Sequence, residues 1–394
     1  MRIRTLPARS LTFAAPIRAP NVREGLRKAR HHPVIVLVGI ALLSVPVGGQ
    51  QNDGPLLDRV EPQVRQPLKE LPEAVVAETS RLVYTVSPLS STGLLSQQIG
   101  NALDALLRQA KNAPITGLRA FVAGSGDTRR VRTLVAETFM ARRLPLPVLT
   151  VVQIGALPGR GVQIVMEATG VSRQTENPQG IAFLDAQASD AANLPARVIP
   201  LVKKALGDLK ADLAAAGMDG KDVLRATCFV SSLEDYAEAR RSVSTEFPRA
   251  VENFVQPLRA PSHGLAQCEI VASIRGTARE APAGGELSRV AMVRARRVVL
   301  SGDQIAFGSR EEDARLAYQR LGKALEENGS SLRQAAWLSI YALSATEGEQ
   351  ARRIGSQFLN ADNPPAGAVL VCEDLPSLDA SFAAEVVAIL QDSP

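Results

Sequence analysis

The stretch LRATCFVSSLEDYAEARRSVSTEF, residues 224–247, recurs in altered form at two other places in the chain. Its counterparts are LRAFVAGSGDTRRVRTLVAETF at 118–139 and AAWLSIYALSATEGEQARRIGSQF at 335–358. Each copy reads as an apolar strand, a polar turn and an arginine-containing helix that ends at a phenylalanine. Because self-similarity at a regular interval indicates a repeated structural unit, the 394 residues are expected to form three copies of one unit.

The sequence on either side of each copy repeats as well. A longer amphipathic helix precedes each copy, predicted at about 95–110, 196–217 and 313–329. Gly217 and Gly329 can close the last two of these helices in the left-handed conformation. Two strands follow each copy, and the second strand carries a glutamate: Glu167, Glu269 or Glu385. Each unit is therefore predicted to run strand–strand–helix–strand–helix–strand–strand, which is an α+β fold.

The predicted boundaries place unit 1 at 72–170, unit 2 at 171–277 and unit 3 at 282–391. A sheet covered by helices on one face needs cover on the other face. Three units can provide it together by packing their sheets around a pseudo-threefold axis. We therefore expect a monomeric chain that folds as an intramolecular pseudotrimer, with the sheets inside and the helices outside.

The first 49 residues have the pattern of an export signal. A basic segment at 1–32 is followed by an uncharged apolar run at 33–47 and then by small and polar residues. This order is typical of a secretory signal, with cleavage expected before Gln50. The alternative is an uncleaved anchor at 33–47, a run that is short beside the roughly 20 residues of a spanning helix. With a linker at 50–71, the sequence predicts a periplasmic or extracellular protein that meets the membrane only through this segment.

The distribution of charge argues against a nucleic-acid partner. The whole chain has 45 basic and 40 acidic residues, a net charge of +5. Eight of the basic residues and one of the acidic residues lie in 1–32, so the rest of the chain has a net charge of about −2. A body without net positive charge has no overall field to attract a phosphate backbone.

The remaining chemistry-bearing residues give few signals. Cys228, Cys268 and Cys372 lie in apolar strand-like segments and are expected to be buried thiols, with a Cys228–Cys268 disulfide as the alternative. His263 lies in a turn without a partner for Ser-His-Asp chemistry. No cluster of His, Cys and carboxylates has metal-ligand spacing, and no phosphate-binding loop follows a strand, so we expect neither metal nor cofactor.

Arginine pairs occur on or near the second helix of each unit, at 129–130, 240–241 and 352–353. The simpler interpretation is a solvated helix face on which arginines pair with glutamates at helical spacing, such as Glu238. The alternative is a rim that binds a partner.

Taken together, the repeated elements resemble the Rid (YjgF-like) family of imine and enamine deaminases. The copy at 224–247 carries the clearest match, and Val299–Gln304, which includes Ser301, is similar to the family's apolar-Ser-Gly strand. The resemblance implies a chorismate-mutase-like fold. Since the family is known as homotrimers with active sites at subunit junctions, it also implies that this chain is a covalent trimer.

The resemblance implies where the active-site residues would stand. In the family, an arginine that opens the penultimate strand clamps the substrate carboxylate, and a glutamate two residues before the repeated glutamate positions the hydrolytic water. The arginine position corresponds to Leu149, Glu252 and Gly367 in the three units. The glutamate position corresponds to Val165, Gln267 and Ala383. No unit keeps either residue, so the sites are expected to be degenerate and to hold no catalytic residue.

The segment 252–273 reads as a hairpin whose two strands bring Glu252 and Gln267 into one cleft. Such a cleft would repel a carboxylate and accept a neutral or cationic ligand. The candidate ligand-binding residues are Glu252, Asn253, Gln267 and Ser301. The sequence thus predicts an exported Rid-like protein that binds a small molecule or a protein partner in clefts between its units. The alternative is a deaminase or related hydrolase with reassigned residues, such as Glu252 or Gln267.

Overall fold

The computed structural model describes residues 69–110, 113–124, 126–190, 197–276, 278 and 287–391. All of them belong to one compact unit, Arg65–Pro394. Three predicted segments lie outside the described residues: the signal or anchor at 1–49, residues 50–68 of the linker, and, apart from Ala278, the segment 277–286 between predicted units 2 and 3. Within the described ranges, no helix combines the length and the apolar character needed to cross a bilayer.

The first sheet has the strand order β2-β5-β3-β4. Its strands are β2 (Leu82–Val86), β5 (Ile164–Val171), β3 (Ile115–Ala123) and β4 (Val148–Ile154). Helix α1 (Leu95–Gln109) precedes β3, and α2 (Thr128–Ala141) connects β3 to β4. Strand β3 is parallel to β4 and antiparallel to β5, because the α2 crossover lets β4 start at the same end of the sheet as β3.

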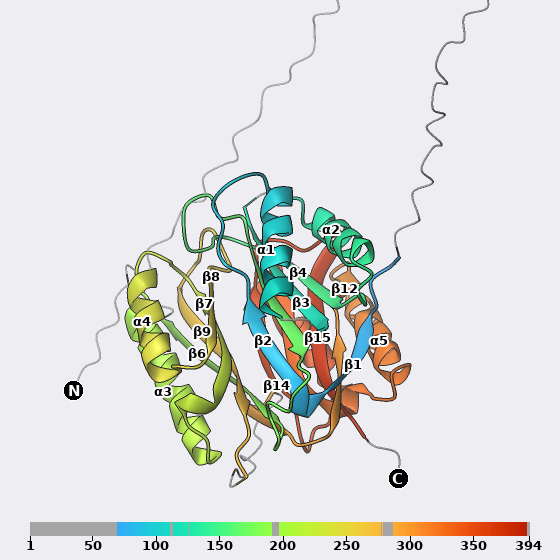
Figure 1. The fold of residues 1–394 in the computed structure, drawn as a ribbon. Coiled ribbons are helices and arrows are strands. Elements are labelled where there is room, and N and C mark those ends of the chain that lie inside the picture. Colours follow the sequence, from blue (N-terminus) through green and yellow to red (C-terminus); the bar gives the residue numbers. More distant parts are fainter. Residues whose placement is uncertain are drawn as a thin grey trace, which may run out of the picture. The chain divides into compact units, whose positions relative to one another are not determined.

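The second sheet has the order β10-β6-β9-β7-β8. Its strands are β10 (Val290–Val293), β6 (Ile181–Asp190), β9 (Gly264–Ser273), β7 (Val223–Val230) and β8 (Val251–Val255). Helices α3 (Ile199–Ala215) and α4 (Tyr236–Glu246) belong to this part of the chain, and both pack on the sheet in Figure 1.

The third sheet has the order β1-β11-β15-β13-β14, with β12 also paired to β15. Its strands are β1 (Ala74–Glu78), β11 (Arg297–Ser301), β12 (Gln304–Phe307), β15 (Ala380–Leu390), β13 (Ala335–Ala342) and β14 (Ala366–Val371). Helices α5 (Glu311–Glu326) and α6 (Ala345–Gly355) accompany it, and short 3-10 helices lie at Thr79–Arg81, Gly220–Asp222 and Leu332–Gln334. The predicted α+β class is therefore confirmed.

Each sheet packs two helices against one face through its own apolar core. The opposite faces share two further cores, in which side chains from all three sheets meet. One shared core contains Phe121, Phe229 and Tyr341, and the other contains Val148, Phe183 and Trp337. Burying both faces of each sheet explains why the central strands β3, β7 and β13 are apolar almost throughout.

Two strands join a sheet other than that of their own predicted unit. Strand β1 pairs with β11, and β10 pairs with β6. In Figure 1, β1 lies apart from β2, although only residues 79–81 separate the two strands in the chain. Unit 2 also differs from the predicted order, because a single long strand, β6, stands where two strands were expected before α3.

The predicted hairpin at 252–273 is wrong. Its two strands and the turn between them are present, but β8 and β9 do not pair with each other. Strand β7 lies between them, parallel to β8 and antiparallel to β9. Alternation identifies strands but not their partners, and here the preceding helix α4 delivers β8 to the far side of β7.

The helix ends behave as predicted. Gly217 and Gly329 both have positive φ, of 77° and 80°. After each glycine, the next amide donates to a carbonyl five residues earlier: Met218 to Leu213, and Ser330 to Leu325. This is the pattern of a Schellman cap, which supplies partners for carbonyls at the helix end.

The cysteine prediction is wrong for two of the three residues. Cys228 and Cys268 stand directly opposite each other in the β7–β9 ladder and form a disulfide. Cys372 is a buried free thiol. The sequence shows that these segments are apolar strands but not their register, and the register decides which two sulfurs meet.

Candidate functional site

The repeated glutamates meet at the point where the three sheets face one another. In the strand registers each one stands opposite a polar residue of its own sheet: Arg119 opposite Glu167, Thr227 opposite Glu269, and Ser339 opposite Glu385. The three sheets thus have a polar residue at matching register positions, and only the first sheet has an arginine at that position.

Arg119 contacts all three glutamates. Its Nε donates to Glu167 at 2.9 Å, its Nη2 donates to Glu269, and its Nη1 lies 3.4 Å from Glu385. Burial opposes the charge of Arg119, but these carboxylates outweigh that effect and raise its pKa further above its ordinary value. One guanidinium therefore links three sheets, because its five donors can serve several acceptors at once.

Neutral groups and a second arginine complete the central cluster. The Thr227 hydroxyl and the Asn253 amide donate to Glu167 Oε1 at 2.6 and 2.7 Å. Arg225 lies 3.6 Å from Glu167 and 3.4 Å from Glu269. Burial alone would raise the pKa of Glu167, but Arg119 and Arg225, with these hydrogen bonds, lower it to about 2.

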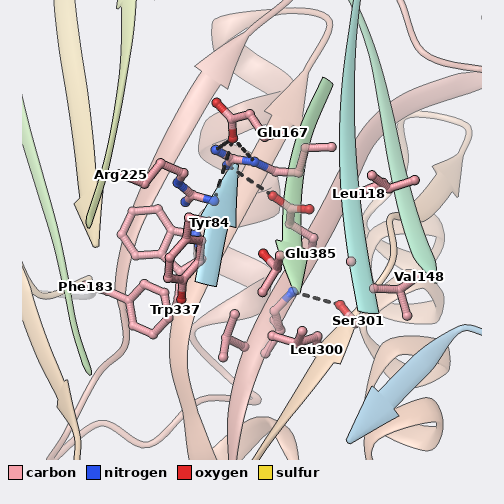
Figure 2. Close-up of a pocket in the computed structure, with 15 residues that line it drawn as sticks. Tyr84, Leu118, Val148, Glu167, Phe183, Arg225, Leu300, Ser301, Trp337 and Glu385 are labelled. Carbon is pink, nitrogen blue, oxygen red and sulfur yellow. Dashed lines mark hydrogen bonds and ion pairs between the residues drawn. The ribbon is translucent and has the colours of Figure 1, made fainter. Parts of the chain in front are cut away.

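A small cavity adjoins this cluster (Figure 2). It lies beside Gly117, where the first sheet has no side chain, and Arg225 and Trp337 border it from the other two sheets. Figure 2 shows Glu167, Glu385 and Arg225 directed toward the cluster, with the rings of Tyr84, Phe183 and Trp337 nearby. Arg119, Glu167, Arg225 and Glu385 of its lining belong to the charge network, although Arg225 Nε has no hydrogen-bond partner among the described residues.

Four of the six positions expected to correspond to the family's arginine and glutamate line pockets between sheets, two in each pocket. Val165 and Glu252 line one pocket, here called the Glu252 cleft. Gln267 and Gly367 line another, the Gln267 cleft. Glu252 and Gln267 were expected in a single cleft, and the structure separates them because β7 lies between their strands.

In the Glu252 cleft, a glutamate stands where the resemblance places an arginine, and neighbouring side chains bind its carboxylate. Arg240 Nε lies 3.3 Å from the Glu252 carboxylate, and the Ser244 hydroxyl also donates to it. The arginines of this helix were expected to pair with glutamates at helical spacing such as Glu238, but Arg240 contacts Glu252, and Glu238 contacts Lys203 at 3.3 Å. The Glu252 carboxylate is therefore held by α4.

The remaining two positions, Leu149 and Ala383, line neither of these clefts. Leu149 instead contacts the backbone of the third sheet's β11–β12 connection. The carbonyl of Leu149 accepts from the Asp303 amide at 3.4 Å. A Cβ on Gly302 would come within 2.9 Å of that carbonyl oxygen, so glycine permits the approach. The Ser301 hydroxyl accepts from the Val386 amide at 2.8 Å, while Ala383 is buried in an apolar core. Ser301 is thus committed to a backbone contact.

The Gln267 cleft is lined by two sheets and helix α6. Its apolar wall is formed by Pro257, Leu258, Leu265, Leu287, Val369 and Val371. The polar lining from the second sheet includes Gln267, Asp185 and Gln187, and Ser231 follows directly after β7. Gln267 Nε2 lies 3.2 Å from each Asp185 oxygen. Gln267 is 2% exposed, and its Oε1 has no hydrogen-bond partner among the described residues.

Asp185 lines this cleft but was not among the site residues predicted from the sequence. Burial raises the pKa of Asp185 well above its usual range, Glu269 adds to that effect, and Gln267 and Arg289 oppose it. The one signal in the sequence was that this carboxylate directly follows the apolar residues Ile181–Leu184. In the structure it stands opposite Glu269 in the strand register. His263, also on this cleft, is exposed and contacts Ser262 at 3.1 Å, as expected of a turn residue.

Among the residues that the structure describes, no group of three or more His, Cys, Asp and Glu side chains is placed to hold a metal ion. The central carboxylates surround a guanidinium instead.

No family model matches the chain, and no curated protein matches it. Several solved structures are similar to parts of it. RidA from the Antarctic bacterium Psychrobacter sp. is 18% identical, with 29% of this chain and 99% of that chain covered and a TM-score of 0.22. Yeast Mmf1 is 20% identical, with 28% and 98% covered and a TM-score of 0.23. Rv2704 of Mycobacterium tuberculosis, a YjgF/YER057c/UK114 family member, is 17% identical, with 23% and 78% covered and a TM-score of 0.22.

Proposed function

We propose that residues 72–391 are three Rid-like units that form an intramolecular pseudotrimer. Two observations support this arrangement. Each sheet contains the same run of four strands with two accompanying helices. Glu167, Glu269 and Glu385, at matching places in the three units, all contact Arg119. Light scattering on the purified protein should give the mass of one chain, and a mass of three chains would contradict the arrangement.

We propose further that the protein binds a small molecule in the Gln267 cleft. The observation that carries this proposal is Gln267, a buried side chain that lines the cleft and whose Oε1 has no hydrogen-bond partner among the described residues. Buried polar groups are normally hydrogen-bonded, so a free acceptor at a pocket indicates a missing donor. A mostly apolar wall with few polar groups is also typical of ligand pockets.

The proposed binding role does not include the family's reaction. The cleft has Gly367 where the resemblance places an arginine, and a side chain at Gly367 would overlap the carbonyl oxygen of Leu338. Gln267 stands where the water-positioning glutamate would be. An amide can donate and accept hydrogen bonds but does not act as a general base at neutral pH.

A fragment screen followed by NMR or thermal shift tests the binding role. We expect hits whose effects disappear in Val371→Trp, because the indole would fill the cleft. The matched control is Val76→Trp, on the exposed side of β1. If hits persist unchanged in Val371→Trp, the ligand site lies elsewhere.

One observation favours the alternative of a reassigned deaminase. Arg352 of α6 lines the same cleft and could replace the lost arginine as a carboxylate clamp. Its Nε and Nη2, however, donate to Glu349 at 3.0 and 2.6 Å. Hydrolysis of 2-aminoacrylate-type imines by the wild type that is abolished in Arg352→Ala would establish this alternative.

We also propose that the protein is exported. The pattern of residues 1–49 supports export, and so does the Cys228–Cys268 disulfide, because such bonds persist mainly in oxidising compartments. Cell fractionation with N-terminal sequencing tests it: we expect a mature form that starts near Gln50 outside the cytoplasm. Recovery of residues 1–32 on a soluble cytoplasmic form would contradict export.

A further inference from the structure

We propose that the ligand of the Gln267 cleft is a small primary amine, bound as its ammonium ion, with a compact apolar body. This inference rests on the proposed function, namely that this cleft is the ligand site. It goes further by assigning the chemical class from the acceptors, the charges and the wall of the cleft.

Two neighbouring side chains of the second sheet that line the cleft, Gln267 and Asp185, offer acceptors. Gln267 Nε2 is engaged by the two Asp185 oxygens, at 3.2 Å each. In this orientation Gln267 Oε1 has no hydrogen-bond partner among the described residues, although its side chain lines the cleft. When it is ionised beside a bound cation, Asp185 has further acceptor capacity, since a carboxylate can accept about four hydrogen bonds. A ligand that reaches both groups must therefore donate, and an ammonium group donates three hydrogen bonds.

The charge around these acceptors also favours a cation. Asp185 stands opposite Glu269 in the strand register, and Glu269 contacts the central cluster. The central carboxylates Glu167, Glu269 and Glu385 outnumber the arginines Arg119 and Arg225 that contact them. An ammonium ion beside Asp185 would offset this excess, whereas a carboxylate would add to it.

The remaining charged groups of the cleft do not reverse this preference. Arg352 is neutralised by its two-pronged pair with Glu349. Arg289, which opposes the raised pKa of Asp185, is paired with Asp212 at 2.7 Å. The lining of the cleft, as described, includes no lysine.

The apolar wall of the cleft determines which body the ligand can have beyond its ammonium group. It is built from prolines, leucines and valines, and the cleft has a volume of about 440 Å³. Apolar surface of this kind favours a branched hydrocarbon body over a polar or charged one. A short amine with a branched alkyl chain satisfies both the acceptors and the wall.

Three probes that share one hydrocarbon body test this assignment: isoamylamine, isoamyl alcohol and isovalerate. Calorimetry on the purified full-length protein at neutral pH should show the amine binding about tenfold more tightly than either of the others. Asp185→Asn and Gln267→Leu should each weaken amine binding by about tenfold. The matched control is Asp208→Asn, a change of the same chemistry on the exposed side of α3, which should leave binding unchanged.

Each other outcome overturns the assignment in a recognisable way. Isovalerate binding that is lost in Arg352→Ala would assign the cleft to carboxylates and leave the proposed binding role standing. Equal affinity for all three probes would show that the wall alone selects the ligand. Absence of binding for all three would refute the amine assignment, and the fragment screen with Val371→Trp would then decide separately whether the cleft binds anything. Thermal unfolding of each variant shows whether a loss of binding reflects a loss of fold.

Discussion

The Asn253 side chain donates to the Glu167 carboxylate at 2.7 Å and so joins the second sheet to the first. Asn253, which was predicted to bind ligand, lines the Glu252 cleft, and its buried side chain is engaged in this contact. The equivalent residue of the first sheet, Thr150, donates in the same way to Glu385 of the third. The third equivalent is Ala368, which has no polar side chain, and Glu269 is held by Arg119 and Arg225 instead. A polar side chain at the same register position therefore donates to the glutamate of another sheet in two of three cases, and two arginines take its place in the third.

Glu167→Gln should destabilise the protein by about 3 kcal/mol at neutral pH, because the pKa of this carboxyl is lowered from 4.5 to about 2. A lowered pKa contributes stability that is present above the ordinary pKa and is lost as the pH falls through the folded-state value. The difference between wild type and variant should thus shrink between pH 4.5 and about 2. Urea unfolding across this range measures it, and a difference that does not vary with pH would contradict the electrostatic account.

Removing the disulfide should also destabilise the fold. Cys228 and Cys268 are 40 residues apart in sequence, and closing a loop of that size restricts the unfolded chain by about 3–4 kcal/mol. We expect the Cys228→Ala/Cys268→Ala variant to unfold at a lower urea concentration. The wild type in reducing buffer should behave similarly, whereas Cys372→Ala controls for the loss of a buried thiol. If the wild type, unfolded and refolded in reductant, unfolds at the same urea concentration as the oxidised protein, the bond contributes no stability.

Asp185→Asn should stabilise the unliganded protein at neutral and higher pH. Burial and Glu269 raise the pKa of Asp185, with Gln267 and Arg289 opposing, so the neutral carboxyl fits the folded state best. Its favourable contribution is present below the ordinary pKa of about 3.9 and is lost as the pH rises through the folded-state value. Asparagine avoids that loss. The melting temperature of the variant should exceed that of the wild type increasingly as the pH rises, whereas Asp208→Asn should show no such trend.

Affinity for 2-keto acids should be recoverable in the Glu252 cleft. Val165→Glu and Glu252→Arg would restore the two family residues to one pocket, and an arginine clamp contributes charge-assisted hydrogen bonds of about 1.5–3 kcal/mol. Calorimetry with pyruvate should detect binding by this double variant. The control is Glu252→Arg with Gln267→Glu, whose positions line different clefts. Equal gains in both double variants would contradict the placement of the clefts.

The sequence by itself determined the local features of this protein. Periodicity of 2 and 3.6 residues identified the repeated strands and helices, because a segment's apolar pattern reflects which of its faces is buried. Gly217 and Gly329 marked helix ends, because only a residue free to adopt positive φ closes a helix in this way. The recurrence of Glu167, Glu269 and Glu385 was also visible, although nothing in the sequence showed what they contact.

Only the tertiary structure decided the partners. The placement of β7 between β8 and β9, the Cys228–Cys268 pair and the exchange of β1 and β10 all depend on strand register and order. Those depend in turn on packing between segments that lie far apart in the chain. The same holds for the site: Gln267 shares a cleft with Gly367 rather than with Glu252, because two sheets face each other there. A side chain's chemistry is encoded locally, whereas its neighbours, its burial and its pKa follow from long-range contacts that no single segment specifies.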